Sequence, residues 1–161
     1  MIVVADTSPI ANLLLIGQLD LLAHVYGRVI IPEAVNKEIL ALARFGYDIQ
    51  SFTDAIWIET IPIADEVFGD FFAADLDKGE AEALCLAREL DADWLLIDER
   101  KGTAIAKSIG LQTIGVLGIL LSAKRRGQVK AVMPLVHDLI EKAGFWLSKE
   151  VLVRIAAEAN E

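Results

Sequence analysis

Two apolar runs that each lead into an aspartate constrain this chain more than any other feature. Residues 2–5 run directly into Asp6, and residues 94–97 run directly into Asp98. All-apolar runs of this length are typical of strands that are buried on both faces of a parallel sheet. In open α/β sheets, ligands bind outside the carboxyl ends of the strands. Both aspartates are therefore predicted to lie at the ligand-binding edge of such a sheet.

The rest of the chain alternates between short strand patterns and helical patterns. Three further strands are predicted at residues 28–31, 56–59 and 112–114. Helical patterns lie between and after the strands, at residues 19–26, 32–43, 80–90, 101–108, 116–124, 129–142 and 148–159, with a less regular stretch at 61–72. This alternation favours an α/β fold, with a parallel sheet of about four to five strands flanked by helices on both faces.

The first helix is predicted to begin just after Asp6. Ser8 suits the N-cap and Pro9 suits the first helical position, because proline lacks the amide hydrogen that this position leaves unpaired. The apolar residues that follow continue to a stop at Gly17. Asp6 would then lie between the end of a strand and the start of a helix.

Composition limits the classes of protein that this chain can belong to. A length of 161 residues suits a single domain over residues 1–161, and 55% hydrophobic residues exclude a disordered chain. No apolar run is long enough to span a bilayer, and no basic lead marks a signal peptide, so we expect no membrane association. Cys85 is the only cysteine, which excludes an internal disulfide and a thiolate metal cluster and fits a cytoplasmic protein.

The net charge of −9 counts against broad nucleic-acid binding, because an acidic chain repels a polyanion at long range. Local basic clusters nevertheless occur at residues 100–101, at Lys107 and at residues 124–126. Each cluster alone is typical of a solvated helix face. Such clusters can still contact phosphates if the acidic residues lie elsewhere or hold a cation.

The two aspartates predict a site for a hard divalent cation. If their strands are neighbours in the sheet, the Asp6 and Asp98 carboxylates converge, and each raises the pKa of the other. A divalent cation relieves that repulsion, and an all-oxygen ligand set favours Mg²⁺ or Mn²⁺ over zinc. The only histidines, His24 and His137, are far apart in the sequence and suit the core or the surface better.

Further acids can join this site from neighbouring helices. Glu80 opens a helix directly after Gly79, and Glu38 borders the apolar face of another helix. Asp77 and Glu82 are alternatives to Glu80, and Glu99 is an alternative to Asp98. Each acid also has a purely structural interpretation. Asp77 can cap its helix, Glu82 can lie on a solvated face, and Asp6 can cap the first helix.

The order of these motifs resembles that of the PIN domain family over nearly the whole chain. The motifs that carry the resemblance are Asp6-Thr7-Ser8-Pro9, Pro32-Glu33-Ala34-Val35 leading to Glu38, Gly79-Glu80-Ala81-Glu82-Ala83, and Leu96-Ile97-Asp98. The stretch from Gly115 to Lys124, with Gly127 after it, resembles the subgroup of short prokaryotic PIN-like proteins known as DUF3368. The resemblance implies a three-layer PIN-like fold.

The resemblance also implies a function and a set of site residues. It implies a Mg²⁺- or Mn²⁺-dependent ribonuclease that is often the toxin half of a toxin–antitoxin pair of the VapC type. Matched by position, the acidic site comprises Asp6, Glu38, Glu80 and Asp98, and Ser8 supplies the hydroxyl that supports the first acid. Thr7 is predicted to support Asp6 together with Ser8. Many PIN domains carry aspartate where this chain has Glu80, which leaves Asp77 as a substitute. Thr103 stands where the subgroup would have a basic residue.

These observations predict hydrolysis of RNA phosphodiester bonds. One or two cations would be held by Asp6, Glu80 and Asp98, with Glu38 at the rim. Contacts to the RNA backbone are predicted for three basic residues, Arg100, Lys101 and Lys107. The expected partners are RNA, a small antitoxin protein and a second copy of the chain in a homodimer.

Two other interpretations remain open at this stage. The chain can be a PIN-like binding protein that has little or no activity and acts through a protein partner, whose Arg or Lys would neutralise the acids. Alternatively, a strand that ends in aspartate also begins phosphatases of the haloacid dehalogenase type. Those enzymes need a second aspartate two residues later, and that position is Ser8, so this interpretation ranks last.

Overall fold

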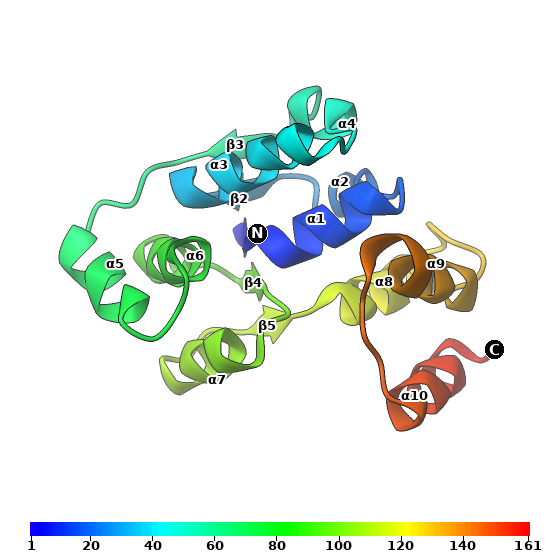
Figure 1. The fold of residues 1–161 in the computed structure, drawn as a ribbon. Coiled ribbons are helices and arrows are strands. Elements are labelled where there is room, and N and C mark those ends of the chain that lie inside the picture. Colours follow the sequence, from blue (N-terminus) through cyan, green and yellow to red (C-terminus); the bar gives the residue numbers. More distant parts are fainter.

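A five-stranded parallel sheet forms the centre of the protein in the computed structural model, which describes residues 1–161 (Figure 1). The strand order is β3-β2-β1-β4-β5, so that β1 lies in the middle with β4 as its neighbour. The strands are β1 (Val3–Ala5), β2 (Val29–Ile31), β3 (Ile58–Thr60), β4 (Trp94–Leu96) and β5 (Thr113–Ile114). The predicted α/β fold with a parallel sheet is therefore confirmed.

Ten α-helices and one short 3₁₀ helix, η1, connect and follow the strands. They are α1 (Thr7–Leu15), α2 (Leu21–Tyr26), α3 (Glu33–Ala41), η1 (Leu42–Phe45), α4 (Gln50–Thr53), α5 (Glu66–Ala73), α6 (Lys78–Glu89), α7 (Arg100–Ser108), α8 (Val116–Arg125), α9 (Met133–Ala143) and α10 (Lys149–Ala159). None of them combines the length and the apolar character that crossing a membrane requires.

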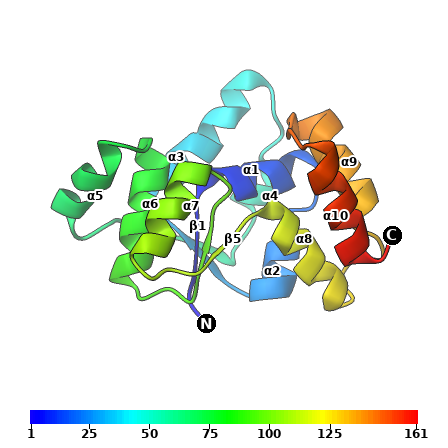
Figure 2. The same ribbon diagram turned by 90° about the horizontal axis from the view of Figure 1, so that it is seen from below.

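The sheet lies between two layers of helices because its side chains alternate between its faces. In β1, Val3 and Ala5 pack into the larger of two apolar cores, with α1, α8 and α9, whereas Val4 packs into the smaller core, with α6. Figures 1 and 2 show α5, α6 and α7 on one side of the sheet and α1, α8, α9 and α10 on the other. All strands point the same way, so their carboxyl ends share one edge.

The start of α1 differs from the sequence-based prediction. The helix begins at Thr7 with Asp6 as its N-cap residue, so the prediction of Ser8 as N-cap is wrong. Asp6 keeps an extended backbone, and its amide still donates to the Leu96 carbonyl of β4. The chain therefore turns from strand to helix within one residue. Pro9 falls at the third helical position, which it tolerates because that amide needs no helical partner.

The start of α9 also differs from the prediction, whereas the stretch at residues 61–72 is less regular, as predicted. Helix α9 begins at Met133 rather than at residue 129, with Pro134 in its first turn, where proline's fixed backbone angle suits a helix start. The irregular stretch at residues 61–72 contains α5, which starts only at Glu66. Asp65 caps α5 by accepting a hydrogen bond from the Phe68 amide.

The start of α9 is stabilised from a distant part of the chain. The Glu161 carboxylate accepts hydrogen bonds from the amides of Val132 (2.8 Å) and Met133 (3.0 Å). It also pairs with the Lys124 ammonium of α8 at 2.9 Å. The Val132 amide, followed by the other bonds, lowers the pKa of Glu161 from 4.5 to about 2. Glu161 therefore joins α8 and α9 to the segment after α10.

This contact predicts a pH-dependent effect of Glu161→Gln. The folded-state pKa lies below the unfolded one, so the contribution of Glu161 to stability is present above about pH 4.5 and is lost as the pH falls toward about 2. Thermal melts should therefore show a lower Tm for the variant at pH 7, and the difference should narrow through this acidic range. Glu158→Gln, which removes only an exposed pairing with Arg154, serves as the control and should leave Tm nearly unchanged. Equal Tm values for Glu161→Gln and Glu158→Gln at pH 7 would contradict the assignment.

Candidate functional site

Asp6 is the centre of the acidic site because it is the one charged residue that the fold buries almost completely. The residue is 1% exposed, and its Oδ1 has no hydrogen-bond partner. The pKa of Asp6 rises from 3.8 to about 7, mainly because the carboxylate is buried. The Thr7 amide lowers this pKa, and the charges of Glu80, Asp77 and Glu38 raise it. Three other acids therefore lie within electrostatic reach of Asp6.

Asp98 occupies the corresponding place on the neighbouring strand, two residues after β4 ends. Its Oδ1 accepts a hydrogen bond of 3.0 Å from the Val116 amide at the start of α8, while its Oδ2 is buried without a partner. Burial raises the pKa of Asp98 to about 6, and the Val116 bond opposes that rise. A Cβ atom at Gly115 would overlap Oδ1, so this carboxylate occupies space that the glycine leaves open.

Glu38 reaches the same region from α3. Its Oε2 accepts a hydrogen bond from the Thr7 hydroxyl at the start of α1. Its carboxylate also lies directly against Gly79, where an added Cβ would come within 2.5 Å of Oε2 and 2.7 Å of Oε1. Helices α1, α3 and α6 therefore meet at this carboxylate.

Glu80 and Asp77 are bound to each other's backbone at the start of α6. Asp77 caps the helix by accepting from the Glu80 amide at 2.8 Å, and Glu80 accepts in return from the Asp77 amide at 3.3 Å. This capping box is a common way to satisfy the free amides of a helix start. Burial raises the pKa of Glu80 to about 7, with contributions from the charges of Asp77 and Glu99.

Glu82 and Glu99, the two remaining alternative acids, accept hydrogen bonds from backbone amides at helix starts. Glu82 accepts a hydrogen bond of 3.2 Å from the Ala34 amide in the first turn of α3. Glu99 is the N-cap residue of α7 and accepts from the amides of Lys101 and Gly102. Both acids thus have structural roles, although Glu99 is close enough to raise the pKa of Glu80.

The residues fit a hard cation by their chemistry. Asp6 Oδ1 and Asp98 Oδ2 are buried oxygens without a partner, at the ends of adjacent strands. Carboxylate oxygens are the ligands that Mg²⁺ and Mn²⁺ prefer, and a cation would satisfy both atoms. However, the side chains as they stand bring no three His, Cys, Asp or Glu residues close enough together to hold a metal ion. The donor types fit, whereas the arrangement is more open than a formed site.

Of the two hydroxyls in the Asp6-Thr7-Ser8-Pro9 motif, only that of Thr7 bonds to an acid of the site. Ser8 makes no side-chain hydrogen bond to Asp6, whose Oδ1 remains unpaired. Thr7 does make such a bond, to Glu38. The sequence predicts Thr7, together with Ser8, as support for Asp6, but it does not predict the places of Gly79 and Gly115 against carboxylates. A signal was available, since each of these residues directly adjoins an acid or a predicted helix start.

The three basic residues that were predicted to contact RNA lie at two places. Arg100 and Lys101 are exposed in the first turn of α7, which starts at the carboxyl edge of the sheet. Lys101 lies 3.7 Å from Asp75 in an exposed ion pair. Lys107 is in the last turn of α7, about 10 Å further along the axis. Only the first two residues are at the same end of the helix as the acids.

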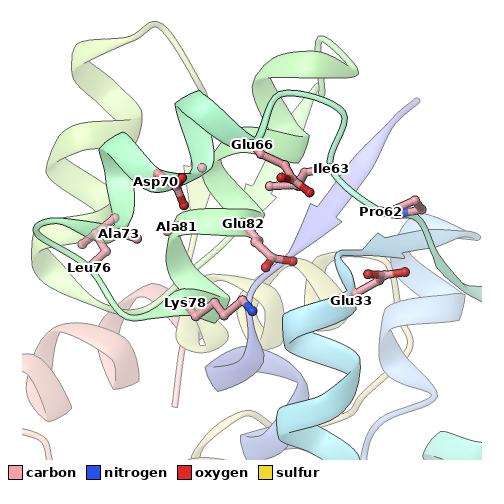
Figure 3. A pocket seen from close by; sticks show the side chains of 11 residues that line it. Glu33, Pro62, Ile63, Glu66, Asp70, Ala73, Leu76, Lys78, Ala81 and Glu82 are labelled. Carbon is pink, nitrogen blue, oxygen red and sulfur yellow. The ribbon is translucent and has the colours of Figure 1, made fainter.

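A cavity of about 510 Å³ lies beside α6, between α5 and the start of α3 (Figure 3). None of Asp6, Glu38, Glu80 and Asp98 lines it. Its charged lining residues are Glu33, Glu66, Asp70, Lys78 and Glu82. Figure 3 shows Glu82 and Lys78 extending from α6 toward Glu33 of α3. This cavity is separate from the acidic site at the strand ends.

Comparison with known proteins places this geometry in a family. A family model described as DUF3368, a PIN domain, matches residues 2–161. The fold is also similar to that of a PilT N-terminus domain protein, SSO1118, from the hyperthermophilic archaeon Sulfolobus solfataricus P2. That structure has a TM-score of 0.59 and 22% sequence identity, over 76% of this chain and 93% of that one. No curated protein sequence matches the chain. These matches confirm the resemblance that the sequence motifs indicated and the PIN-like fold.

The buried charge of Asp6 predicts that Asp6→Asn stabilises the protein in metal-free buffer. Asp6 ionises near pH 3.8 when unfolded but only at about pH 7 when folded, so the native state binds more protons between these values and stability falls as the pH rises. The variant avoids the cost of a buried charge. Its free energy of unfolding should therefore exceed that of the unsubstituted protein by on the order of 2–4 kcal/mol at pH 8 and by almost nothing near pH 4. Urea unfolding with EDTA at both pH values measures the difference.

Asp70→Asn is a suitable control, because Asp70 is exposed on α5. That control should change stability by less than about 0.5 kcal/mol at either pH. A loss of stability in Asp6→Asn at pH 8 would show that the buried carboxylate is not strained by its charge.

Proposed function

Because the chain belongs to the PIN domain family, we propose that it is a metal-dependent endoribonuclease that hydrolyses RNA phosphodiester bonds. PIN domains are generally nucleases, so family membership itself supplies the broad activity. The observation that most supports the proposal is the pair of buried, unpartnered carboxylate oxygens of Asp6 and Asp98 at the ends of adjacent strands. A buried unpaired charged oxygen is costly unless it serves a ligand.

Each acid has a proposed role. Asp6, Glu80 and Asp98 would hold Mg²⁺ or Mn²⁺, with Glu38 at the rim. Such a cation supplies Lewis-acid chemistry, since it lowers the pKa of a water molecule and offsets charge on the phosphate and on the leaving oxygen. Glu80 would have to release the Asp77 amide in order to contribute its carboxylate. Exchanging one exposed hydrogen bond of 3.3 Å for a cation is a small rearrangement.

The remaining parts of the site need only bind and orient the RNA. The raised pKa values of Asp6, Glu80 and Asp98 mean that positive charge beside them is favourable. Contacts to the phosphate backbone are assigned to Arg100 and Lys101, and their exposure in the first turn of α7 supports this role. The proposal gives Lys107 a weaker role, because it lies at the far end of α7.

We further propose that the protein acts as the toxin of a toxin–antitoxin pair and forms a homodimer. Apolar side chains that a partner could cover are exposed on two parts of the surface. Val67 and Phe71, on one face of α5, are 79% and 71% exposed, and Trp146, between α9 and α10, is 83% exposed. Large exposed apolar residues of this kind are typical of protein contact surfaces.

The second candidate function is a PIN-like binding protein with weak or no catalysis. It is favoured by the absence of any three acids close enough to hold a metal and by the engagement of Glu80 in a capping box. In that case an Arg or Lys side chain of the partner would provide the positive charge that would neutralise Asp6 and Asp98. Metal-dependent cleavage of RNA by the purified protein distinguishes the two candidates.

The main test of the proposal is RNA cleavage in Mn²⁺ with substituted acids. Asp6→Asn and Asp98→Asn should each lower the cleavage rate on the order of 100-fold or more, because each removes a charged ligand but keeps its shape. Asp70→Asn, the exposed control, should cleave at the normal rate, and EDTA should abolish cleavage in every case. If both site variants cleave as fast as the unsubstituted protein, the proposed function is wrong.

A second experiment decides between Glu80 and Asp77 as the third acid. Glu80→Gln should reduce the cleavage rate as strongly as Asp98→Asn. Asp77→Ser should lower the cleavage rate less than about threefold, because serine can still cap α6. Rates from the same Mn²⁺ assay, with circular dichroism to confirm folding, give the comparison. The reverse order of effects would assign the role to Asp77.

A further inference from the structure

One hydrogen bond links the parts of the acidic site that come from α1 and α3. The Thr7 hydroxyl, at the first position of α1, donates to Oε2 of Glu38, which is 31 residues further along the chain in α3. Thr7 is the residue directly after Asp6, so this bond attaches Glu38 to the turn of chain that carries the buried aspartate. Both side chains are partly buried.

The opposite side of the Glu38 carboxylate is defined by Gly79. Both carboxylate oxygens occupy the space that a Cβ at this position would need. Gly79 is the second residue of α6 and has an ordinary helical backbone, so nothing in its conformation requires glycine. An alanine would favour the helix, since it has the higher helix propensity. The requirement for glycine here is therefore the room that it gives to Glu38.

Without these two contacts, charge repulsion would move the Glu38 carboxylate away from Asp6. Its carboxylate is near enough to Asp6 to raise the pKa of that acid. Like charges repel, and Glu38 is only half-buried on a long, flexible side chain. A donor on one side and an open space on the other keep it beside Asp6.

We propose that Thr7 is a positioning residue that holds the Glu38 carboxylate over Gly79 and beside Asp6. The inference rests on the proposed function insofar as Glu38 belongs to the acidic site. Thr7 does not itself contact a cation or the RNA. It prepares one acid of the site before any cation binds, and loss of such a supporting residue typically lowers metal affinity on the order of 10–100-fold.

Paired substitutions separate this role from a general effect on folding. Thr7→Val keeps the shape and loses the donor, and should raise the Kd for Mn²⁺ in calorimetry about tenfold. Thr7→Ser restores a donor and should return the Kd to within about threefold of the normal value. Ser8→Ala is the matched control from the adjacent position and should leave the Kd unchanged, because Ser8 makes no bond to either acid.

Gly79→Ala tests the other side of the carboxylate. It should weaken Mn²⁺ binding about tenfold while leaving Tm the same or higher, because the flexible end of Glu38 can move aside and alanine favours the helix. In the double variant with Thr7→Val, Mn²⁺ binding should weaken by much less than the sum of the two single effects on binding free energy, because both substitutions release the same carboxylate. Full additivity would mean that the two residues act on different groups.

A crystal structure of the Thr7→Val variant separates failure of this inference from failure of the proposed function. If the unsubstituted protein neither binds Mn²⁺ nor cleaves RNA, the proposed function fails, and the position of Glu38 in that crystal still decides the role of Thr7. A carboxylate that leaves Gly79 supports the inference. A carboxylate that stays over Gly79, or equal Mn²⁺ affinity of Thr7→Val and Ser8→Ala, overturns it.

Discussion

The parallel pairing of β1 with β4 is the interaction on which the rest of the structure depends. Its register places Val4 opposite Leu95 and Ala5 opposite Leu96, and the Asp6 amide continues the ladder to the Leu96 carbonyl. This ladder brings Asp6 and the residues just after β4 to the same edge of the sheet, although more than ninety residues separate them in the chain. It also buries Asp6, and that burial is the largest cause of its raised pKa.

Helix starts supply most of the contacts that the acids around this edge make. Asp98 accepts from the first amide of α8, Glu38 is held by the first residue of α1, and Glu80 is bonded within the first turn of α6. Helix starts carry free amides and partial positive charge, so they compensate negative side chains at the edge. Two acids also require space, which Gly79 and Gly115 provide. Asp6 Oδ1 and Asp98 Oδ2 remain without such compensation.

Much of the fold could be predicted from the sequence because its signals are local. Two all-apolar runs and three short strand patterns overlap the five strands, and the alternation of strands with helical patterns predicted a parallel sheet. Predicted helix boundaries were less accurate, as α1 and α9 show. Ser8 looks like an N-cap, but the ladder bond of Asp6 sets the start of α1, and the contact of Glu161 with Val132 and Met133 supports the start of α9. Both contacts come from residues distant in the chain.

The sequence by itself determined which acids are available and that two of them follow buried strands, because apolar pattern and residue type are local properties. Tertiary structure alone decided how these acids are held. It paired the Thr7 hydroxyl with Glu38, bonded Glu82 to the start of α3, and placed glycine against two of the carboxylates. Contacts of this kind depend on distances between elements far apart in the chain, and no spacing within the sequence encodes them.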